Sequence, residues 1–174
     1  ELNNTDPQNF FDIWLIKNCY FYIGTSSGPV DVSYLFNKPT LITNANSFFI
    51  NFPRTKKDRI IFKKPFFNDK VLNLQEHLDL PFKFHNYLED YGNINLIDNT
   101  ENEILNAVKE FDFNMKNNKF DLNDKQVNLN KLLYKNIENH FHNSKNNNLK
   151  NFYLAKNMIR WIKTQEGAVS LSFF

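Results

Sequence analysis

An α/β fold with a mainly parallel sheet is predicted by three features of the sequence. The run Tyr20–Ile23 (YFYI) is apolar throughout, as in strands that are buried on both faces of a parallel sheet. A glycine- and serine-rich turn, Gly24–Gly28 (GTSSG), follows it, and Pro29 then stands where a helix can begin. The run Thr40–Thr43 (TLIT) is typical of a second strand, and the interval is long enough for a helical crossover. Together these segments predict a βαβ unit.

Helices on either side of this unit are predicted from apolar spacing. The first helix begins at Pro7, and its apolar residues recur at helical intervals: Phe10, Phe11, Trp14 and Leu15. The crossover helix is expected to bury Val30, Tyr34 and Leu35. Thr100 and Glu103 have the spacing of a capping box, which predicts the start of a further helix.

The remaining elements are less regular. Short strands are predicted at Ile60–Phe62 and Ile94–Ile97, and a weak helix is predicted over Leu72–Leu80. Two more helices are predicted over Val127–His140 and Leu149–Lys163, so that the part from about 127 to 174 is mainly helical. Neither an internal repeat nor a Pro/Gly-rich linker divides the chain, and we expect residues 1–174 to form one domain.

Composition narrows the class of protein. Hydrophobic residues make up 41% of the 174 residues, which is enough for a buried core. Charged residues make up 23%, but the net charge is only +2, and this balance argues against a nucleic-acid partner, which requires a concentrated basic face. No run approaches the ~18 apolar residues needed to cross a bilayer, so no transmembrane segment is expected.

Disulfide and metal sites are not expected either. Cys19 is the single cysteine, which excludes an internal disulfide, and we expect it to be a buried, inert thiol. The four histidines show no ligand spacing with carboxylates; they are His77, His85, His140 and His142. We therefore expect no metal and no cofactor.

The turn is the segment that points to a binding site. A turn between a parallel strand and a helix presents free backbone N–H groups and the positive end of the helix dipole, and both attract phosphate. Thr25, Ser26 and Ser27 add hydroxyl groups, and Gly24 and Gly28 allow a ligand to approach the backbone. The alternative is a purely structural turn whose serines cap the helix. The turn lacks the Lys-Ser/Thr end of a Walker loop and does not match Gly-x-Gly-x-x-Gly.

The segment GTSSGPVDVSYLFNKPTLITN resembles the C-terminal region of a family of bacterial glycosyltransferases from surface-polysaccharide gene clusters. The shared pattern is a Gly/Ser turn, a short helix ending in Phe-x-x-Pro, and a strand that runs into Asn; here these are Gly24–Gly28, Phe36, Pro39 and Asn44. Two weaker similarities are the helix start at Asn99, Thr100, Glu103 and Ile104, and the ending Gly167–Ser170 followed by Ser172 and Phe173.

This resemblance implies a single Rossmann-like domain, the donor-binding half of a two-domain GT-B enzyme that transfers a sugar from a nucleotide-sugar to a glycan acceptor. The acceptor would bind an N-terminal domain, and the isolated chain would be inactive. Such enzymes need no metal. We expect a cytoplasmic location, with the inner face of the membrane as a second location. A non-catalytic phosphate- or sugar-binding module and a GT-B-shaped sugar-nucleotide epimerase remain as alternatives.

Four further residues complete the expected donor site. Asn44 belongs to the resembling segment, and Arg59 and Lys64 are our choices from the densest basic stretch, where a solvated loop is the alternative. Glu103 is a candidate for the donor ribose, although its place in the capping box also accounts for it.

Overall fold

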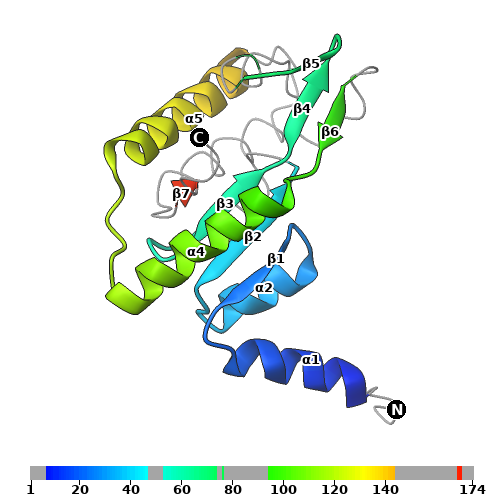
Figure 1. Ribbon diagram of the computed structural model, residues 1–174, viewed down its shortest axis with the longest axis vertical. Helices are drawn as coiled ribbons and strands as arrows, with labels where there is room; N and C mark the ends of the chain where they lie inside the picture. The colour runs from blue at the N-terminus through cyan, green and yellow to red at the C-terminus, as the bar shows by residue number, and fades with distance from the viewer. Residues whose placement is uncertain (1–6, 47–52, 74–75, 77–93, 144–167, 170–174) are drawn as a thin grey trace.

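A computed structural model describes residues 7–46, 53–73, 76, 94–143 and 168–169. It contains four helices and seven strands in this part of the chain (Figure 1). In chain order they are α1 (Pro7–Asn18), β1 (Tyr22–Thr25), α2 (Gly28–Leu35), β2 (Thr40–Ala45), β3 (Arg59–Phe62), β4 (Lys64–Phe67), β5 (Lys70–Val71), β6 (Asn95–Ile97), α4 (Glu101–Asn117), α5 (Asp124–Asn143) and β7 (Ala168–Val169).

The main sheet is parallel and has the strand order β1-β2-β3-β7. β1 and β2 pair with Tyr22 opposite Thr40 and Thr25 opposite Thr43, and α2 connects them. The predicted βαβ unit is therefore confirmed. β1 begins at Tyr22, two residues after the start of the apolar run Tyr20–Ile23. The strand then extends through Gly24 and Thr25 into the segment that was predicted as a turn.

Helices cover both faces of this sheet and give the domain three layers. On one face, α2 and α5 pack on β2 and β3 through Val30, Tyr34, Ile42, Ala45, Ile60, Phe62, Leu129 and Leu133. On the other face, α4 packs on the same strands through Leu41, Ile61, Ala107 and Phe111. Successive residues of β3 point to opposite faces, so a strand without polar alternation serves both layers.

A second, antiparallel sheet with the order β5-β4-β6 extends from the end of the first. Only Lys63 separates β3 from β4, so the chain passes directly from one sheet to the other. The strand predicted at Ile94–Ile97 is β6, and the loop after it leads into α4. This sheet thereby fixes where α4 begins at the edge of the main sheet.

Most helix predictions agree with the structure. The capping box of Thr100 and Glu103 is present at the start of α4, and α5 covers the helix predicted over Val127–His140. The helix predicted over Leu149–Lys163 and most of Leu72–Leu80 lie outside the described residues. None of the helices in the described ranges is long and apolar enough to cross a membrane.

The burial predicted for Leu35 was wrong. Leu35 is 77% exposed, because helical spacing places it on the side of α2 opposite to the buried residues Val30, Ser33 and Tyr34. The apolar residues of α1 are also exposed, with Phe10 at 70%. α1 lies outside the three layers, next to β1 and α2, so most of its surface has no partner among the described residues (Figure 1).

Candidate functional site

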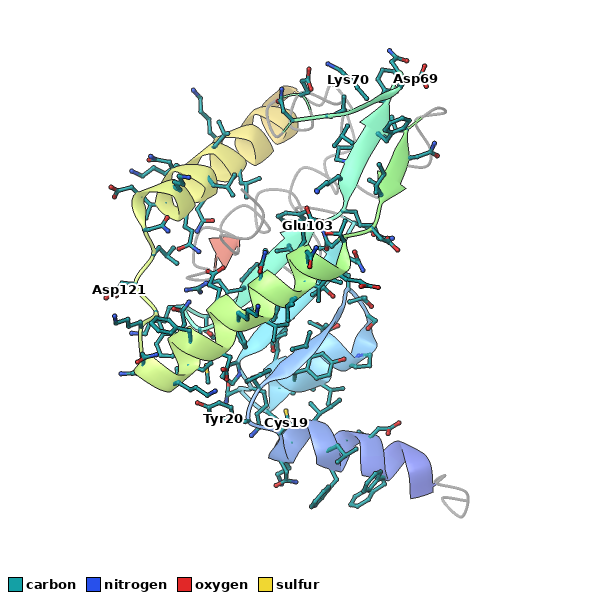
Figure 2. All side chains as sticks on the ribbon, in the orientation of Figure 1. Cys19, Tyr20, Asp69, Lys70, Glu103 and Asp121 are labelled. Atoms are coloured by element: carbon teal, nitrogen blue, oxygen red, sulfur yellow. The ribbon has the colours of Figure 1, made fainter. Side chains whose placement is uncertain are left out.

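The carboxyl ends of the parallel strands bring most of the predicted site residues to one edge. The turn after Thr25 leaves the end of β1, Asn44 lies near the end of β2, and Lys64 follows β3 by two residues. Glu103 lies in the first turn of α4, which begins at this same edge (Figure 2). Open α/β sheets bind their ligands at this edge.

The turn itself is shorter than the sequence suggested. Gly24 and Thr25 belong to β1, Gly28 is the first residue of α2, and only Ser26 and Ser27 lie between the two elements. Ser27 is the N-cap residue, with extended backbone angles, but its side chain does not cap the helix. Its Oγ instead donates to the Thr25 carbonyl oxygen over 3.2 Å.

Fewer backbone donors point out of the turn than a Gly/Ser sequence implies. Pro29 has no N–H group, and the Val30 N–H donates to the Ser27 carbonyl oxygen over 3.0 Å. The N–H groups of Ser27 and Gly28 have no acceptor within the described part of the chain. An anion at this turn would therefore meet two backbone donors at the positive end of α2.

Ser26 supplies a third unused group. Its Oγ is buried and has no hydrogen-bond partner among the described residues. A buried hydroxyl without a partner is unfavourable, and such groups are uncommon in folded proteins. A ligand with acceptor oxygens bound at the turn would satisfy this hydroxyl only after the Ser26 side chain had rotated towards it.

The two glycines of the turn differ in their surroundings. A Cβ atom on Gly28 would meet nothing within 4 Å, so this position faces open space. A Cβ atom on Gly24 would lie 2.7 Å from the ring of Tyr22, which folds back over the strand. Gly24 is thus needed for packing, whereas Gly28 keeps the approach to the turn open.

Asn44 is bound to the start of α4. Its N–H donates to Oδ1 of Asn99 over 2.7 Å, and its own Oδ1 accepts the N–H of Asn99 over 2.6 Å. Asn44 has a left-handed backbone (φ 51°), and the pairing of β2 with β3 shifts register at this point. This bulge directs the end of β2 towards α4, so the Asn44 side chain has a structural role there.

Lys64 and Glu103 form an ion pair beside this junction. Glu103 also accepts the backbone N–H of Thr100 over 2.8 Å and the Thr100 hydroxyl over 3.0 Å. Partial burial by itself would raise the pKa of Glu103, but the bonds from Lys64 and Thr100 outweigh it and the pKa is lowered. Among the predicted site residues, Lys64 is a cation that the structure brings to this edge, and Glu103 is its counter-charge.

Arg59 is not brought to this edge. It is the first residue of β3, at the amino end of the sheet, and is only 2% exposed. Its Nη1 donates to the carbonyl oxygens of Lys56 and Asp58, and Glu110 lies 3.8 Å from its Nε. Arg59 is therefore a buried residue that stabilises the fold, and it lies at the end of the sheet opposite the turn.

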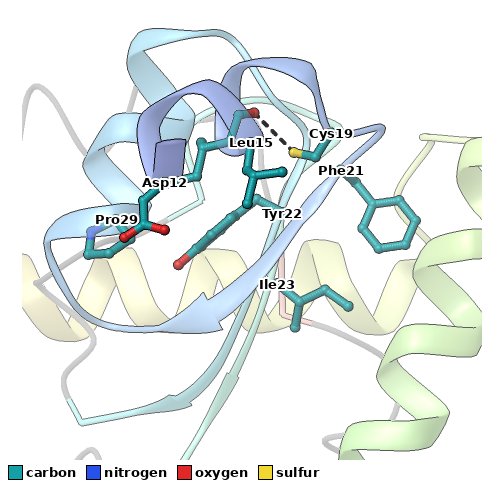
Figure 3. Close-up of a pocket in the computed structure, with 8 residues that line it drawn as sticks. Asp12, Leu15, Cys19, Phe21, Tyr22, Ile23 and Pro29 are labelled. Carbon is teal, nitrogen blue, oxygen red and sulfur yellow. Dashed lines mark hydrogen bonds between the residues drawn. The ribbon is translucent and has the colours of Figure 1, made fainter. Parts of the chain in front are cut away.

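A shallow cavity of about 370 Å³, wide open to solvent, lies next to the turn and was not foreseen from the sequence. It lies between α1 and β1 and reaches Pro29, and its walls are mainly apolar (Figure 3). Its lining residues are Asp12, Leu15, Ile16, Cys19, Phe21, Tyr22, Ile23 and Pro29. Cys19 is only partly buried, contrary to expectation, and its thiol donates to the Ile16 carbonyl oxygen over 3.1 Å.

Polar groups of this cavity gather on the side of the turn. Figure 3 shows the Asp12 carboxylate and the Tyr22 hydroxyl near Pro29. Burial, followed by the neighbouring Cys19, raises the pKa of Tyr22, so this hydroxyl remains a neutral hydrogen-bond donor at pH 7. No periodicity in the sequence could have placed Asp12 and Tyr22 in the wall of one cavity, because this depends on how α1 lies against β1.

Comparison of this chain with protein-family models, with curated proteins and with solved structures finds no match. In the described residues, no group of three or more His, Cys, Asp or Glu side chains is placed to hold a metal ion.

Proposed function

We propose that this chain is the donor-binding half of a metal-independent GT-B glycosyltransferase, a Rossmann-like domain that holds a nucleotide-sugar by its diphosphate. The observation that carries the proposal is the turn after β1, where the Ser27 and Gly28 N–H groups and the Ser26 hydroxyl have no partner among the described residues. Two further observations support the same proposal: the sheet is parallel, and the turn lies at the carboxyl ends of its strands.

The proposed chemistry is stabilisation of the departing diphosphate. Negative charge develops on the phosphate oxygens as the sugar leaves, and fixed donors that already point there lower the barrier. The Ser27 and Gly28 N–H groups are held by the start of α2, so they need no reorganisation. Lys64 is our candidate for a cationic partner along this edge. If Lys64 exchanged Glu103 for a phosphate oxygen of the ligand, it would link α4 to the site.

The cavity beside Pro29 is the place we propose for the nucleoside. Its apolar walls can accept the base, and the Asp12 carboxylate can accept N–H groups of a base or hydroxyl groups of a ribose. The glycan acceptor would be held by a separate N-terminal domain, and the proposed location is cytoplasmic.

Calorimetric titration with UDP and GDP tests the proposal, using the Gly28→Val variant. Because a side chain at Gly28 meets open space in the protein, the fold is expected to be unaffected while the ligand is blocked. We expect binding to weaken by roughly 1–3 kcal/mol, the cost of charge-assisted hydrogen bonds left unmade. Ser27→Ala is the matched variant, with a smaller loss because the backbone donors remain.

Unchanged affinity in a Gly28→Val protein with the melting temperature of the wild type would move the phosphate site away from the turn. Sugar transfer is measured separately, with product analysis after addition of an acceptor. Residues 1–174 alone are expected to bind nucleotide without turnover, so robust transfer by this chain would contradict the assignment of a donor-binding half.

A further inference from the structure

The cavity beside Pro29 combines apolar walls with two polar groups that are free to bind a ligand. Leu15 and Ile23 are among its apolar walls, and Asp12 and Tyr22 supply the polar groups on the side of the turn (Figure 3). Neither the Asp12 carboxylate nor the Tyr22 hydroxyl makes a hydrogen bond or an ion pair with the described part of the chain. The cavity therefore offers one anionic acceptor and one neutral donor to whatever binds there.

The Tyr22 hydroxyl is held close to the start of the turn. A Cβ atom on Gly24 would lie 2.7 Å from the hydroxyl oxygen of Tyr22, so this oxygen lies over the backbone at the end of β1. The Tyr22 ring also packs against the core cluster of α2, β2, β3 and α5, which fixes its direction. A ligand held at the turn by Ser27 and Gly28 is thus next to this hydroxyl and to the cavity.

The charge of Asp12 limits which part of a nucleotide can lie in the cavity. A carboxylate repels phosphate, so the group beside Asp12 is neutral and offers hydrogen-bond donors. A ribose has hydroxyl donors, but it is polar on every side and would leave the apolar walls uncovered. A base has two apolar faces and a polar edge, and because the cavity is open it can lie flat on one wall with its edge towards Asp12.

The two oxygens of a carboxylate distinguish between the four common bases. They accept two adjacent N–H groups, and guanine is the base that offers such a pair, on N1 and on its exocyclic amino group. Uracil has one N–H between two carbonyl oxygens, and the amino groups of adenine and cytosine stand beside an acceptor nitrogen. Each of these bases would set an acceptor against a carboxylate oxygen of Asp12, which is repulsive. The remaining polar atom of the guanine edge, O6, is an acceptor that suits the Tyr22 hydroxyl.

We propose that the cavity selects guanine and that Asp12 is the residue that determines this specificity, so that the ligand of the chain is a guanosine diphosphate sugar. This inference rests on the function proposed for the turn, where the diphosphate is bound, and adds the identity of the base. Discrimination is expected to be strong, because a base without the two donors leaves the Asp12 carboxylate unpaired.

Calorimetric titration of the full chain with three nucleotides tests the proposal. They are GDP, UDP and xanthosine diphosphate, in which an oxygen replaces the exocyclic amino group of guanine. We expect GDP to bind about tenfold or more tightly than either of the others. Xanthosine diphosphate is the sharper comparison, because it has the size and the stacking faces of GDP and differs from it only at the group that faces Asp12.

The Asp12→Asn variant is expected to reverse this preference. An amide keeps one acceptor for the N1 proton and places an N–H donor opposite the added oxygen of xanthine. We expect GDP to bind about tenfold more weakly than to the wild type, and xanthosine diphosphate to bind the variant more tightly than GDP does. A residue with a purely structural role cannot produce that gain. Asp31→Asn is the control, because it makes the same change of charge in the first turn of α2, outside the cavity, and is expected to keep the preference for GDP.

Three outcomes would overturn the assignment of guanine. Equal affinities for the three nucleotides, all weakened by Gly28→Val, would leave the phosphate site in place and show that the base is not selected. An equal loss for all three in Asp12→Asn would place the carboxylate at the ribose. Failure of all three nucleotides to bind the folded wild type would contradict the function proposed for the turn as well.

Discussion

Charged side chains are buried at the amino end of the parallel sheet and remain partly exposed at its carboxyl end. At the amino end, Asp58 and Arg59 are 1% and 2% exposed and make their bonds within the fold. The Asp58 carboxylate accepts the N–H of Thr40 over 2.9 Å and that of Thr55 over 2.7 Å. Figure 2 marks the two ends, since Tyr20 precedes β1 near one end of α4 and Glu103 lies at the other.

At the carboxyl end, charges remain near solvent. Lys63 pairs with Asp98 over 2.8 Å and Lys64 pairs with Glu103. The side chains of Asp98 and Lys64 are 68% and 34% exposed, and those of Lys63 and Glu103 are 24% and 23% exposed. Buried charges that hold loops together cannot also hold a ligand, whereas exposed pairs can exchange a partner. The basic stretch of residues 54–64 therefore did not show which of its cations could bind a ligand. The structure separates them, because β3 carries the chain from the amino end of the sheet to its carboxyl end.

The largest expected effect lies at the amino end, in Asp58→Ala. Removing this carboxylate leaves the N–H groups of Thr40 and Thr55 without their acceptor. The loop before β3 thereby loses the hydrogen bond that joins it to the start of β2. We expect a loss of about 3 kcal/mol in the free energy of unfolding, measured by urea denaturation. Asp31→Ala is the control, because its ion pair with Arg54 is exposed and worth less than ~1 kcal/mol. Equal losses from the two variants would remove the contrast between the ends.

Asn99→Ala is expected to have the next largest effect. Besides its bonds with Asn44, the Asn99 side chain donates to the Phe62 carbonyl oxygen over 2.7 Å, so one amide joins the ends of β2 and β3 to α4. We expect a loss of about 2 kcal/mol in the free energy of unfolding. Asn106→Ala, at an exposed position of α4, is expected to stay within ~0.5 kcal/mol of the wild type. A loss below that size for Asn99→Ala would show that the junction is not held by this amide.

The two glycines sharpen the description of the turn. Gly24→Ala forces the Tyr22 ring to move, and we expect a loss of about 1 kcal/mol in thermal or urea unfolding. Gly28→Ala meets open space at the first position of α2 and is expected to stabilise the fold by ~0.5 kcal/mol, because it restricts the unfolded chain. The reverse order of stabilities would mean that the turn has another backbone arrangement.

The smallest effect concerns pH. The pKa of Glu103 is lowered in the folded protein, so its contribution to stability is present above its ordinary value of about 4.5 and is lost as the pH falls through the folded value. In Glu103→Gln this part of the acid sensitivity is expected to disappear. The difference in melting temperature between wild type and variant, followed from pH 7 downwards, measures it. A difference that is independent of pH would show that Glu103 is not coupled to Lys64.

The sequence predicted the parts of this fold that local pattern controls. The apolar run before Gly24, the strand at Thr40–Thr43 and the capping box of Thr100 and Glu103 each depend on neighbours in the chain, and the structure agrees with them. The burial of Arg59 and the cavity of Asp12 and Tyr22 depend on contacts between distant segments. No spacing in the chain encodes those contacts, so they needed the structure.

Exposure was the property that the sequence predicted least well. Apolar spacing in α2 suggested that Leu35 is buried, but a helical pattern does not say whether another layer is present to cover each apolar residue. In α2 the residue in question, Leu35, falls on the side of the helix opposite to the buried Val30 and Tyr34. In α1, Phe10 and Trp14 are 70% and 49% exposed, whereas Ile16 lines the cavity beside β1.

The reciprocal bonds between Asn44 and Asn99 also have a kinetic meaning. They join residues 55 positions apart, so they form only after β3, β4 and β6 have been drawn into one loop. Closing a loop of that length has an entropic cost that local contacts do not share, and contacts of this kind slow folding. In hydrogen-exchange experiments, the amides of Asn44 and Asn99 are expected to exchange together, at a rate that reports the opening of this whole segment.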